Sequence, residues 1–202
     1  MPALVQQLLN MFDYIFAQTD VFAARFKQLG AHHVYVAGNL KYMAPPLPYD
    51  AGALQIFTVS IGTRPTVLFA STHAGEETIA ANAHTALKAA WPDLLTIIIP
   101  RHPRRGVEIL NALKQSGLNT ALRTQAPVPD KNCDIYIADT LGELGLFFSA
   151  CKHVVMGNSF VTTPGGGHNP LEPAQFGCAI AYGPSMYNFA DMTALLEADN
   201  AA

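Results

Sequence analysis

The chain is short of charged residues and has no excess of positive charge. Asp, Glu, Lys and Arg make up only 13% of its 202 residues, against about a quarter in a typical globular protein. The formal net charge is -3, and half of the residues are hydrophobic. This composition excludes a disordered chain and argues against a basic field that would attract nucleic acid. The length fits one large domain or two small ones.

Cysteine is scarce, and the motifs of metal sites are missing. Cys133, Cys151 and Cys178 are far apart and form no CxxC pair, and the chain contains neither HxxxH nor DxD. An odd number of widely spaced cysteines suits a reducing compartment and argues against a disulfide framework. We therefore expect buried free thiols, no metal site and no cofactor.

Long hydrophobic runs are also missing. No apolar stretch approaches the roughly 18–20 residues that cross a bilayer. The first residues lack the basic start and the small-residue cleavage site of a signal peptide. The sequence therefore predicts neither a transmembrane helix nor a signal peptide. A helical pattern begins near Asn188 and stops almost at once, so we expect both ends to be cuts through a larger protein.

The chain alternates strand-like and helix-like segments, which is typical of a parallel α/β sheet. The run 94–99 is almost continuously apolar, as expected for a strand covered on both faces. Residues 38–50 are rich in proline and predict a loop or linker. The predicted strands are 14–17, 34–37, 66–70, 94–99, a weak one near 122, 134–138, 153–156 and 178–182, and the predicted helices are 20–29, 75–90, 103–115, 141–150 and 171–176.

The first of these helices has recognisable ends. Thr19 or Asp20 can cap its start, and Gly30 lies where a left-handed stop belongs. A helix of this kind turns one apolar face toward a core. The apolar face is expected to consist of Val21, Phe22, Ala24, Phe26 and Leu29.

Polar side chains cluster directly after four of the predicted strands. In parallel sheets, ligands bind beyond the carboxyl ends of the strands, where helix N-termini offer free N–H groups and a positive dipole. We expect the four clusters to converge on one rim and to form a pocket. The clusters are Ser71, Thr72 and His73; Arg101 and His102; Asp139, Thr140, Gly142 and Glu143; and Gly165, Gly166, Gly167, His168 and Asn169 with Glu172.

The glycine triplet before His168 and Asn169 allows a ligand to approach the backbone closely. Neither a P-loop nor a GxGxxG motif is present. Pro170 fits the first turn of the helix after the triplet. Glu172, three residues after Asn169, either closes a capping box or accepts hydrogen bonds from a ribose diol.

The basic residues near these strand ends allow more than one interpretation. Arg101 ends an apolar strand, and its fork of N–H donors suits a phosphate. Arg104 and Arg105 are interpreted as a solvated basic helix start. Lys41 follows a strand and a glycine, so it either reaches an anionic leaving group or faces solvent. His73 either donates to a phosphate or sugar hydroxyl or is structural.

Seven segments of the chain resemble, in the same order, motifs of the 3-deoxy-D-manno-octulosonic acid (Kdo) transferases. The segments are FAQTDVFAARFKQLGA, VAGNLKY, FASTHAGEE, IIIPRHPRR, IADTLGELGLFF, GGGHNPLEPAQFG and YGPSMYNF. The resemblance implies the GT-B arrangement of two Rossmann-like halves, truncated here at both ends. Residues 1–44 would be the end of the acceptor half and a crossover segment. Residues 45–202 would be a Rossmann-like CMP-sugar-binding domain that lacks its closing helices.

The resemblance also implies a reaction and a location. Kdo transferases are glycosyltransferases that transfer Kdo from CMP-Kdo to a lipid A precursor in lipopolysaccharide biosynthesis. They act at the cytoplasmic face of the bacterial inner membrane, without a metal and with inversion at the anomeric carbon. The membrane anchor and the general-base glutamate would lie before Met1, so this fragment would be unanchored and inactive alone. The expected partners are CMP-Kdo, a lipid A precursor held by the missing half, and the membrane surface, but not nucleic acid.

The resemblance further implies roles for individual residues. Lys41 would stabilise charge in the transition state. Leu141 replaces a methionine that is usual in the family, and Pro164 stands where a basic residue is common. The expected CMP-Kdo contacts are Ser71, Thr72, His73, Pro100, Arg101, His102, Leu141, Gly142, Glu143, Gly167, His168, Asn169, Pro170, Leu171 and Glu172.

Two other hypotheses fit the same pattern. One is a UDP-sugar epimerase or hydrolase of similar two-half architecture, and the other is a non-catalytic nucleotide-binding remnant. The segments GNLK and DTLGELG favour the Kdo transferase. A preference for UDP over CMP would contradict it.

Overall fold

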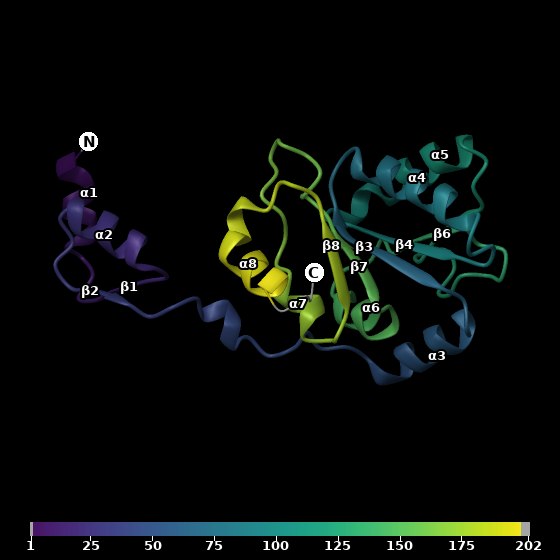
Figure 1. Ribbon diagram of the computed structural model, residues 1–202, viewed down its shortest axis with the longest axis horizontal. Helices are drawn as coiled ribbons and strands as arrows, with labels where there is room; N and C mark the ends of the chain where they lie inside the picture. Colours follow the sequence, from purple (N-terminus) through teal and green to yellow (C-terminus); the bar gives the residue numbers. More distant parts are fainter. Residues whose placement is uncertain (1, 199–202) are drawn as a thin grey trace. The chain divides into compact units, whose positions relative to one another are not determined.

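The computed structural model describes residues 2–198, and for Pro2 and Lys41 it describes the backbone alone (Figure 1). The chain divides into two compact units, Met1–Pro45 and Pro46–Ala202. This division lies one residue from the boundary expected from the sequence. Each unit has a sheet of its own.

The first unit contains a two-stranded parallel sheet, in which Phe16 lies opposite Tyr35. The hydroxyl of Thr19 accepts a hydrogen bond from the Phe22 N–H at 3.3 Å and so caps the second helix. This confirms the cap predicted from the sequence. The elements are α1 (Pro2–Leu9), β1 (Ile15–Ala17), α2 (Asp20–Gln28), β2 (Val34–Val36) and the 3-10 helix η1 (Leu40–Met43).

The apolar face predicted for α2 is largely wrong. Val21 is 61% exposed and Leu29 is 47% exposed, whereas Ala23 is buried. Ala23 packs with Ala17 and Val34 of the small sheet. A sheet of two short strands covers only a narrow stripe of a helix. The periodicity located this helix but not the residues that it buries.

The second unit is built on a six-stranded sheet with the order β5-β6-β4-β3-β7-β8, in which every neighbouring pair is parallel. This confirms the predicted α/β fold. The strands are β3 (Thr66–Thr72), β4 (Leu95–Pro100), β5 (Thr120–Leu122), β6 (Ile135–Ile137), β7 (His153–Met156) and β8 (Ala179–Tyr182). The helices are α3 (Ala51–Ile61), α4 (Glu76–Lys88), η2 (Pro103–Arg105), α5 (Gly106–Gln115), α6 (Leu144–Ala150), α7 (Leu171–Ala174), η3 (Tyr187–Phe189) and α8 (Ala190–Ala198).

The strand order creates a topological switch point at β3. The chain continues from β3 through α4 to β4 on one side, whereas β7, much later in the sequence, pairs with β3 on the other side. In open parallel sheets, ligands bind beyond the carboxyl ends of the strands at such a point. The loops after β3 and β7 therefore occupy the favoured position for a site.

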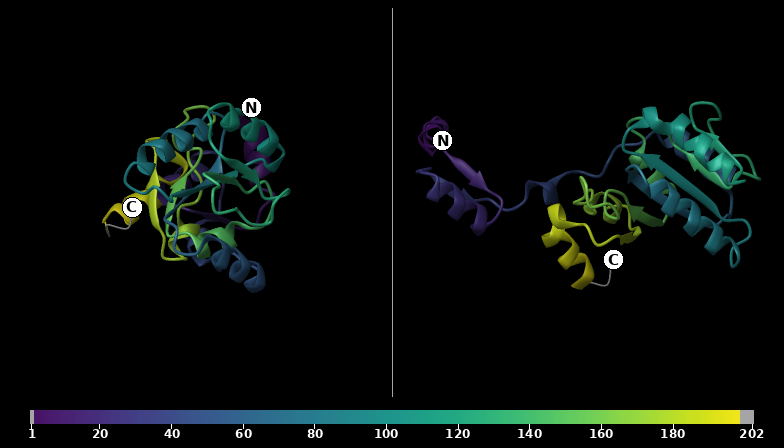
Figure 2. Two further views of the ribbon diagram at one scale, coloured as in Figure 1. Left: turned by 90° about the vertical axis from the view of Figure 1, so that its right-hand side faces the viewer. Right: turned by 90° about the horizontal axis from the view of Figure 1, so that it is seen from above.

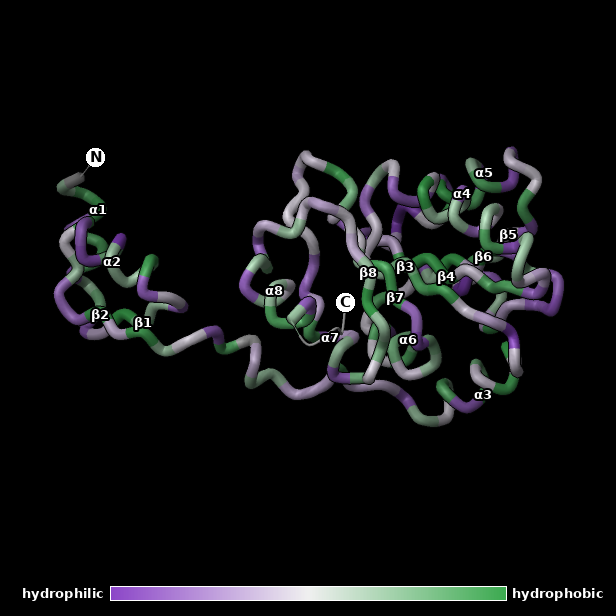
Figure 3. Tube along the Cα trace, viewed as in Figure 1, coloured by the Kyte–Doolittle hydropathy of each residue, from purple (hydrophilic) through white to green (hydrophobic). Residues whose placement is uncertain are grey.

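Two apolar layers cover the faces of this sheet. Helices α3 and α6 pack on one face through residues such as Phe57 and Phe147, and α4 and α5 pack on the other through Ala80 and Leu113. Figure 1 and the left view of Figure 2 show the strands between these helices. The central strands are hydrophobic along their length in Figure 3, and every residue of β4 is buried. This confirms the prediction of a strand covered on both faces.

Helix α3 was not predicted from the sequence. Asp50 caps it by accepting a hydrogen bond from the Ala53 N–H at 2.6 Å. Phe57 is fully buried, and its ring meets that of Phe147 edge-on with centroids 5.2 Å apart. However, Ile56 and Val59 are exposed, so apolar residues lie on several sides of the helix. This blurs the periodicity that would have indicated it.

The three cysteines are buried and free, as expected. Burial raises the pKa of Cys133 to about 11 and the pKa of Cys151 to about 12. Thiols with such pKa values carry little thiolate at neutral pH and are poor nucleophiles. Separately, none of the helices in residues 2–198 combines the length and apolar character needed to cross a bilayer.

Candidate functional site

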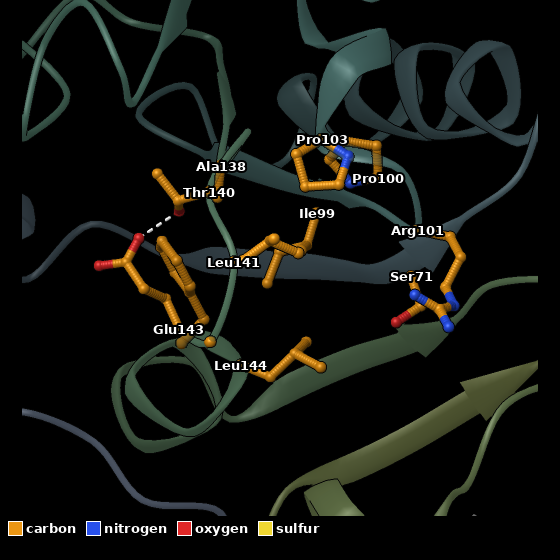
Figure 4. Close-up of a pocket in the computed structure, with 12 residues that line it drawn as sticks. Ser71, Ile99, Pro100, Arg101, Pro103, Ala138, Thr140, Leu141, Glu143 and Leu144 are labelled. Carbon is orange, nitrogen blue, oxygen red and sulfur yellow. Dashed lines mark hydrogen bonds between the residues drawn. The ribbon is translucent and has the colours of Figure 1, made fainter.

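A pocket opens at the carboxyl ends of β3, β4 and β6 (Figure 4). It contains about 400 Å³ of empty space, part of which is open to solvent. Ile99, Leu144 and Phe147 supply apolar lining. From the predicted set, the pocket brings together Ser71, Pro100, Arg101, Leu141, Gly142 and Glu143.

Arg101 follows β4 directly and offers an uncompensated positive charge. Its backbone N–H donates to the carbonyl of Thr72 at 3.0 Å, which ties the ends of β3 and β4 together. Its side chain is exposed and lies beside Ser71 in Figure 4. Among the carboxylates of residues 2–198, none forms an ion pair with this guanidinium. Arg101 is therefore available to an anionic ligand.

Glu143 lies on the pocket rim and is held by Arg123. The Nε of Arg123 donates to Oε2 at 2.6 Å, its Nη2 donates to Oε1, and the Thr140 hydroxyl also donates to Oε2. Burial acts to raise the pKa of Glu143, but the hydrogen bonds from Arg123 and Thr140 outweigh it, and the net pKa is lowered. Glu143 is thus an oriented carboxylate at neutral pH. It can accept hydrogen bonds from a ligand but cannot donate one.

Three histidines gather near Arg101. The Nε2 atoms of His73 and His168 lie 3.1 Å apart, and the two ring planes are inclined by 29° with their centroids 5.3 Å apart. The ring of His102 lies 6.2 Å from that of His73. Burial, together with His73 and Arg101, lowers the pKa of His168 to about 4. Within residues 2–198, no group of three potential ligands is arranged to hold a metal ion.

The glycine-rich loop is anchored by Asn158. The Nδ2 of Asn158 donates to the backbone carbonyl of Gly165 at 2.7 Å. The backbone carbonyl of Asn158 accepts a hydrogen bond from the Gly167 N–H at 2.8 Å. Gly167 has a φ of 74°, and a Cβ there would lie 2.1 Å from the sulfur of Met186. The positive φ strongly favours glycine at this position. The turn that it forms brings His168 against His73.

Asn169 lies directly before Pro170, which is the N-cap residue of the short helix α7. Its Oδ1 accepts a hydrogen bond from the Leu171 N–H at 3.2 Å, and its Nδ2 donates to Oε1 of Glu172 at 3.3 Å. Glu172 thus makes a local contact with the side chain of Asn169, which is not the backbone contact of the predicted capping box. A contact between Glu172 and a ribose stays a prediction.

Glu76 binds the two central loops together, a role that was not predicted from the sequence. Its side chain is buried, and its Oε2 accepts from the N–H groups of His73 and Asn158 at 2.8 and 2.7 Å. Its Oε1 accepts from the N–H groups of Ser159 and Phe160, both at 3.0 Å. One carboxylate thus satisfies backbone donors located after β3 and β7. The acidic start of α4 was visible in the sequence, but its distant partners were not.

The interpretation of Arg105 as part of a solvated basic helix start is wrong, because its side chain is paired with Glu77. Its two terminal nitrogens donate to the oxygens of Glu77 at 2.8 and 3.1 Å. These hydrogen bonds raise the pKa of Arg105 above its ordinary value. Thr72 is fully buried, and its hydroxyl donates to Oε1 of Glu77 at 2.8 Å. The Thr72 side chain therefore supports the loop after β3 from the protein interior and is not exposed to a ligand.

Residues 1–44 match the family model described as 3-deoxy-D-manno-octulosonic-acid transferase (kdotransferase). The crystal structure of the C-terminal CMP-Kdo binding domain of WaaA from Acinetobacter baumannii is similar to this chain, with a TM-score of 0.68 and 31% sequence identity. The match covers 74% of this chain and 77% of that domain. The chain belongs to the Kdo transferase family. Its fold is accordingly that of the Rossmann-like CMP-Kdo binding domain.

Curated Kdo transferases support the same assignment over nearly the whole chain. The enzyme of Rickettsia felis is 35% identical over 93% of this chain, and that of Haemophilus influenzae is 31% identical over 95% of it. The matched part is 40% of the length of the first enzyme and 45% of the length of the second. This chain therefore spans less than half the length of these two relatives.

In this chain, the predicted site residues form two neighbouring groups. The first is the pocket with Arg101 and Glu143, and the second is the His73–His168 pair with the glycine-rich loop. Lys41, in η1, belongs to the first unit, and its side chain lies outside the described part of the chain.

The histidine pair should make the stability of the fold depend on pH. Because the pKa of His168 is lowered to about 4 from 6.5, the unfolded chain binds more protons between these values. Stability should therefore be complete above pH 6.5 and decline as the pH falls toward 4. We expect the melting temperature to drop by roughly 3–5 °C between about pH 7 and 5.

Differential scanning calorimetry of the wild type and His168→Gln across this range would measure the effect. We expect a smaller drop in the variant, because glutamine does not titrate. His73 and His84, whose pKa values burial also lowers, should leave some of the drop in place. The same drop in both proteins would contradict the assigned role of His168.

Proposed function

We propose that this chain binds CMP-Kdo in the pocket at the carboxyl ends of β3, β4 and β6. The whole protein would transfer Kdo from this donor to a lipid A precursor at the inner membrane. The observation that carries the proposal is the uncompensated Arg101 at the pocket mouth, in a domain similar to a CMP-Kdo binding domain. An apolar wall beside a free guanidinium matches the two chemically distinct parts of a nucleotide, base and phosphate.

In this proposal, the pocket residues divide the work of holding the nucleotide. Arg101 binds the phosphate, and Glu143, held in place by Arg123, accepts hydrogen bonds from the nucleoside. The backbone of the glycine-rich loop and Asn169 contact the phosphate and ribose. Positive charge beside the phosphate favours departure of CMP, because negative charge grows there as the bond to Kdo breaks.

The remaining steps of the transfer involve residues beyond this pocket. A hydroxyl of the lipid acceptor would attack the anomeric carbon of Kdo, and CMP would leave from the opposite face. Lys41 is proposed to stabilise the charge of the departing phosphate. A general base that takes the proton of the acceptor hydroxyl would belong to the acceptor half of the protein.

The proposal is tested by calorimetric titration of the purified chain with CMP, UDP and ADP. A thermal melt should first show cooperative unfolding. We expect CMP to bind at least about tenfold more tightly than UDP or ADP. The reason is that UDP and ADP lack the cytosine base of the proposed donor. A preference for UDP would favour an epimerase or hydrolase instead. Absence of binding by the folded chain would contradict a donor site.

A further inference from the structure

The His73–His168 pair joins the two loops at the switch point of the sheet. His73 comes after β3, and His168 ends the glycine-rich turn after β7. Their Nε2 atoms are 3.1 Å apart, which is a hydrogen-bonding distance. The ring planes are inclined by 29° and the centroids lie 5.3 Å apart, so the rings meet through their Nε2 edges, as a hydrogen bond between two ring nitrogens requires.

This geometry restricts the protonation states of the pair. A hydrogen bond between the two Nε2 atoms requires that one carries a proton and the other presents a lone pair. Two neutral rings satisfy this condition when they are opposite tautomers, and a pair with one extra proton satisfies it as well. Two protonated rings would place donor against donor and charge against charge. The pair therefore takes up one proton much more readily than a second, and the two rings titrate as a coupled unit.

The charges that face the pair keep it neutral when no ligand is present. Arg101 and His102, located after β4, and Arg105 of η2 all oppose its protonation, whereas Glu76 of α4 favours it. Burial also disfavours protonation and is the largest cause of the lowered pKa values of both rings. A new negative charge near Arg101 would reverse this balance.

The proposed reaction supplies such a charge at a defined step. The phosphate of CMP-Kdo is a diester and carries one negative charge. When its bond to Kdo breaks, the bonding electron pair stays on the phosphate oxygen, and CMP leaves with a second negative charge. The second pKa of a phosphate monoester is about 6, so free CMP is a dianion at neutral pH.

We propose that the His73–His168 pair takes up one proton from solvent as the phosphate gains its second charge, and thereby stabilises the departing CMP. The inference rests on the proposed function and adds a leaving-group role to these histidines. The proton shared by the two rings balances the new charge, while Arg101 balances the first. Since the extra interaction exists only after bond cleavage has begun, it favours the transition state over the bound donor.

The test measures protons taken up on binding, by calorimetry at pH near 7.5 in buffers of different ionisation enthalpy. We expect CMP to bind with uptake of up to about one proton, because its phosphate is then a dianion. The methyl ester of CMP has a phosphodiester with a single charge, as the phosphate of the donor has, and should bind with almost no proton uptake. Between about pH 8.5 and 7.5, affinity for CMP should rise by up to about tenfold.

Two variants separate the pair from the remainder of the site. The double variant His73→Gln/His168→Gln keeps two hydrogen-bonding side chains but has no imidazole that can titrate at this position, so CMP should bind without proton uptake. The control is His153→Gln, an exposed histidine at the opposite end of β7, which should leave the uptake unchanged.

The possible results distinguish this inference from the proposed function. CMP binding with the same enthalpy in every buffer would overturn the inference and leave the donor site intact. Equal proton uptake with CMP and its methyl ester would overturn the leaving-group role. If the folded chain bound no CMP at all, both the inference and the proposed function would be wrong.

Discussion

Replacing Glu76 with alanine is expected to lower the free energy of unfolding by about 4 kcal/mol or more, because each buried donor left without a partner costs about 1–3 kcal/mol. The carboxylate of Glu76 accepts hydrogen bonds from His73, Asn158, Ser159 and Phe160. Its side chain is only 1% exposed, so water cannot simply take over its role. Urea unfolding followed by circular dichroism measures the loss.

The same substitution should also weaken CMP binding, because Glu76 fixes both loops that carry the histidine pair. Gly157, which precedes Asn158, shows how closely these loops pack: a Cβ on Gly157 would lie 2.3 Å from the carbonyl oxygen of Ser71. Without the carboxylate, the loops would separate and His73 would lose its contact with His168. CMP affinity should therefore fall even under conditions in which the variant stays folded.

Two further variants serve as comparisons for Glu76→Ala. Glu76→Gln keeps one acceptor oxygen but turns an amide N–H₂ toward backbone donors, so we expect about half of the loss. Glu108→Ala removes a carboxylate that is 73% exposed on α5, and should change stability by less than about 0.5 kcal/mol. If Glu76→Ala were no more destabilising than Glu108→Ala, the proposed tie between the loops would be wrong.

Replacing Arg101 with alanine is expected to weaken CMP binding by about 1.5–3 kcal/mol, which is the cost of losing a charge-assisted hydrogen bond. This corresponds to a loss of affinity of roughly 10- to 150-fold. Since Arg101 is exposed and forms no ion pair with a described carboxylate, its removal should leave the melting temperature almost unchanged. Calorimetric titration with CMP measures the affinity.

Arg104→Ala is the matched control for Arg101. Arg104 lies three residues further along and is also exposed, but the pocket lining does not include it. Its removal should weaken CMP binding by less than about twofold, since a surface charge outside the pocket contributes little. Equal losses of CMP affinity in the two variants would mean that the basic segment acts through long-range electrostatic attraction and not through a direct contact of Arg101. An unchanged affinity in Arg101→Ala would mean that the phosphate is held elsewhere.

The strands of the second unit were predicted well because their signals are local. The residues of β4 form a continuous apolar run, and each of them is buried. The predicted strand 153–156 coincides with β7 (His153–Met156). A parallel strand covered on both faces needs only hydrophobic, often β-branched residues, so its identity can be recognised without knowing its neighbours.

Elements whose signals depend on distant packing were predicted poorly. Helix α3 was missed because exposed Ile56 and Val59 hide its buried face. Arg105 was misread because its partner Glu77 lies 28 residues away in the sequence. In α2, the residues that are buried depend on how little of the helix a two-stranded sheet can cover. In each case a neighbour in space, absent from the local sequence, decided the outcome.

The candidate site shows the same division most clearly. The residue types suited to a nucleotide, and their positions after strands, could be recognised along the chain because turns and strand ends are local features. The contact between His73 and His168, which are 95 positions apart, could not. That contact exists because the strand order places β7 beside β3, and because the buried carboxylate of Glu76 holds the two loops together. Strand order and burial are properties of the packed sheet, so only the folded structure could reveal which of these residues act together.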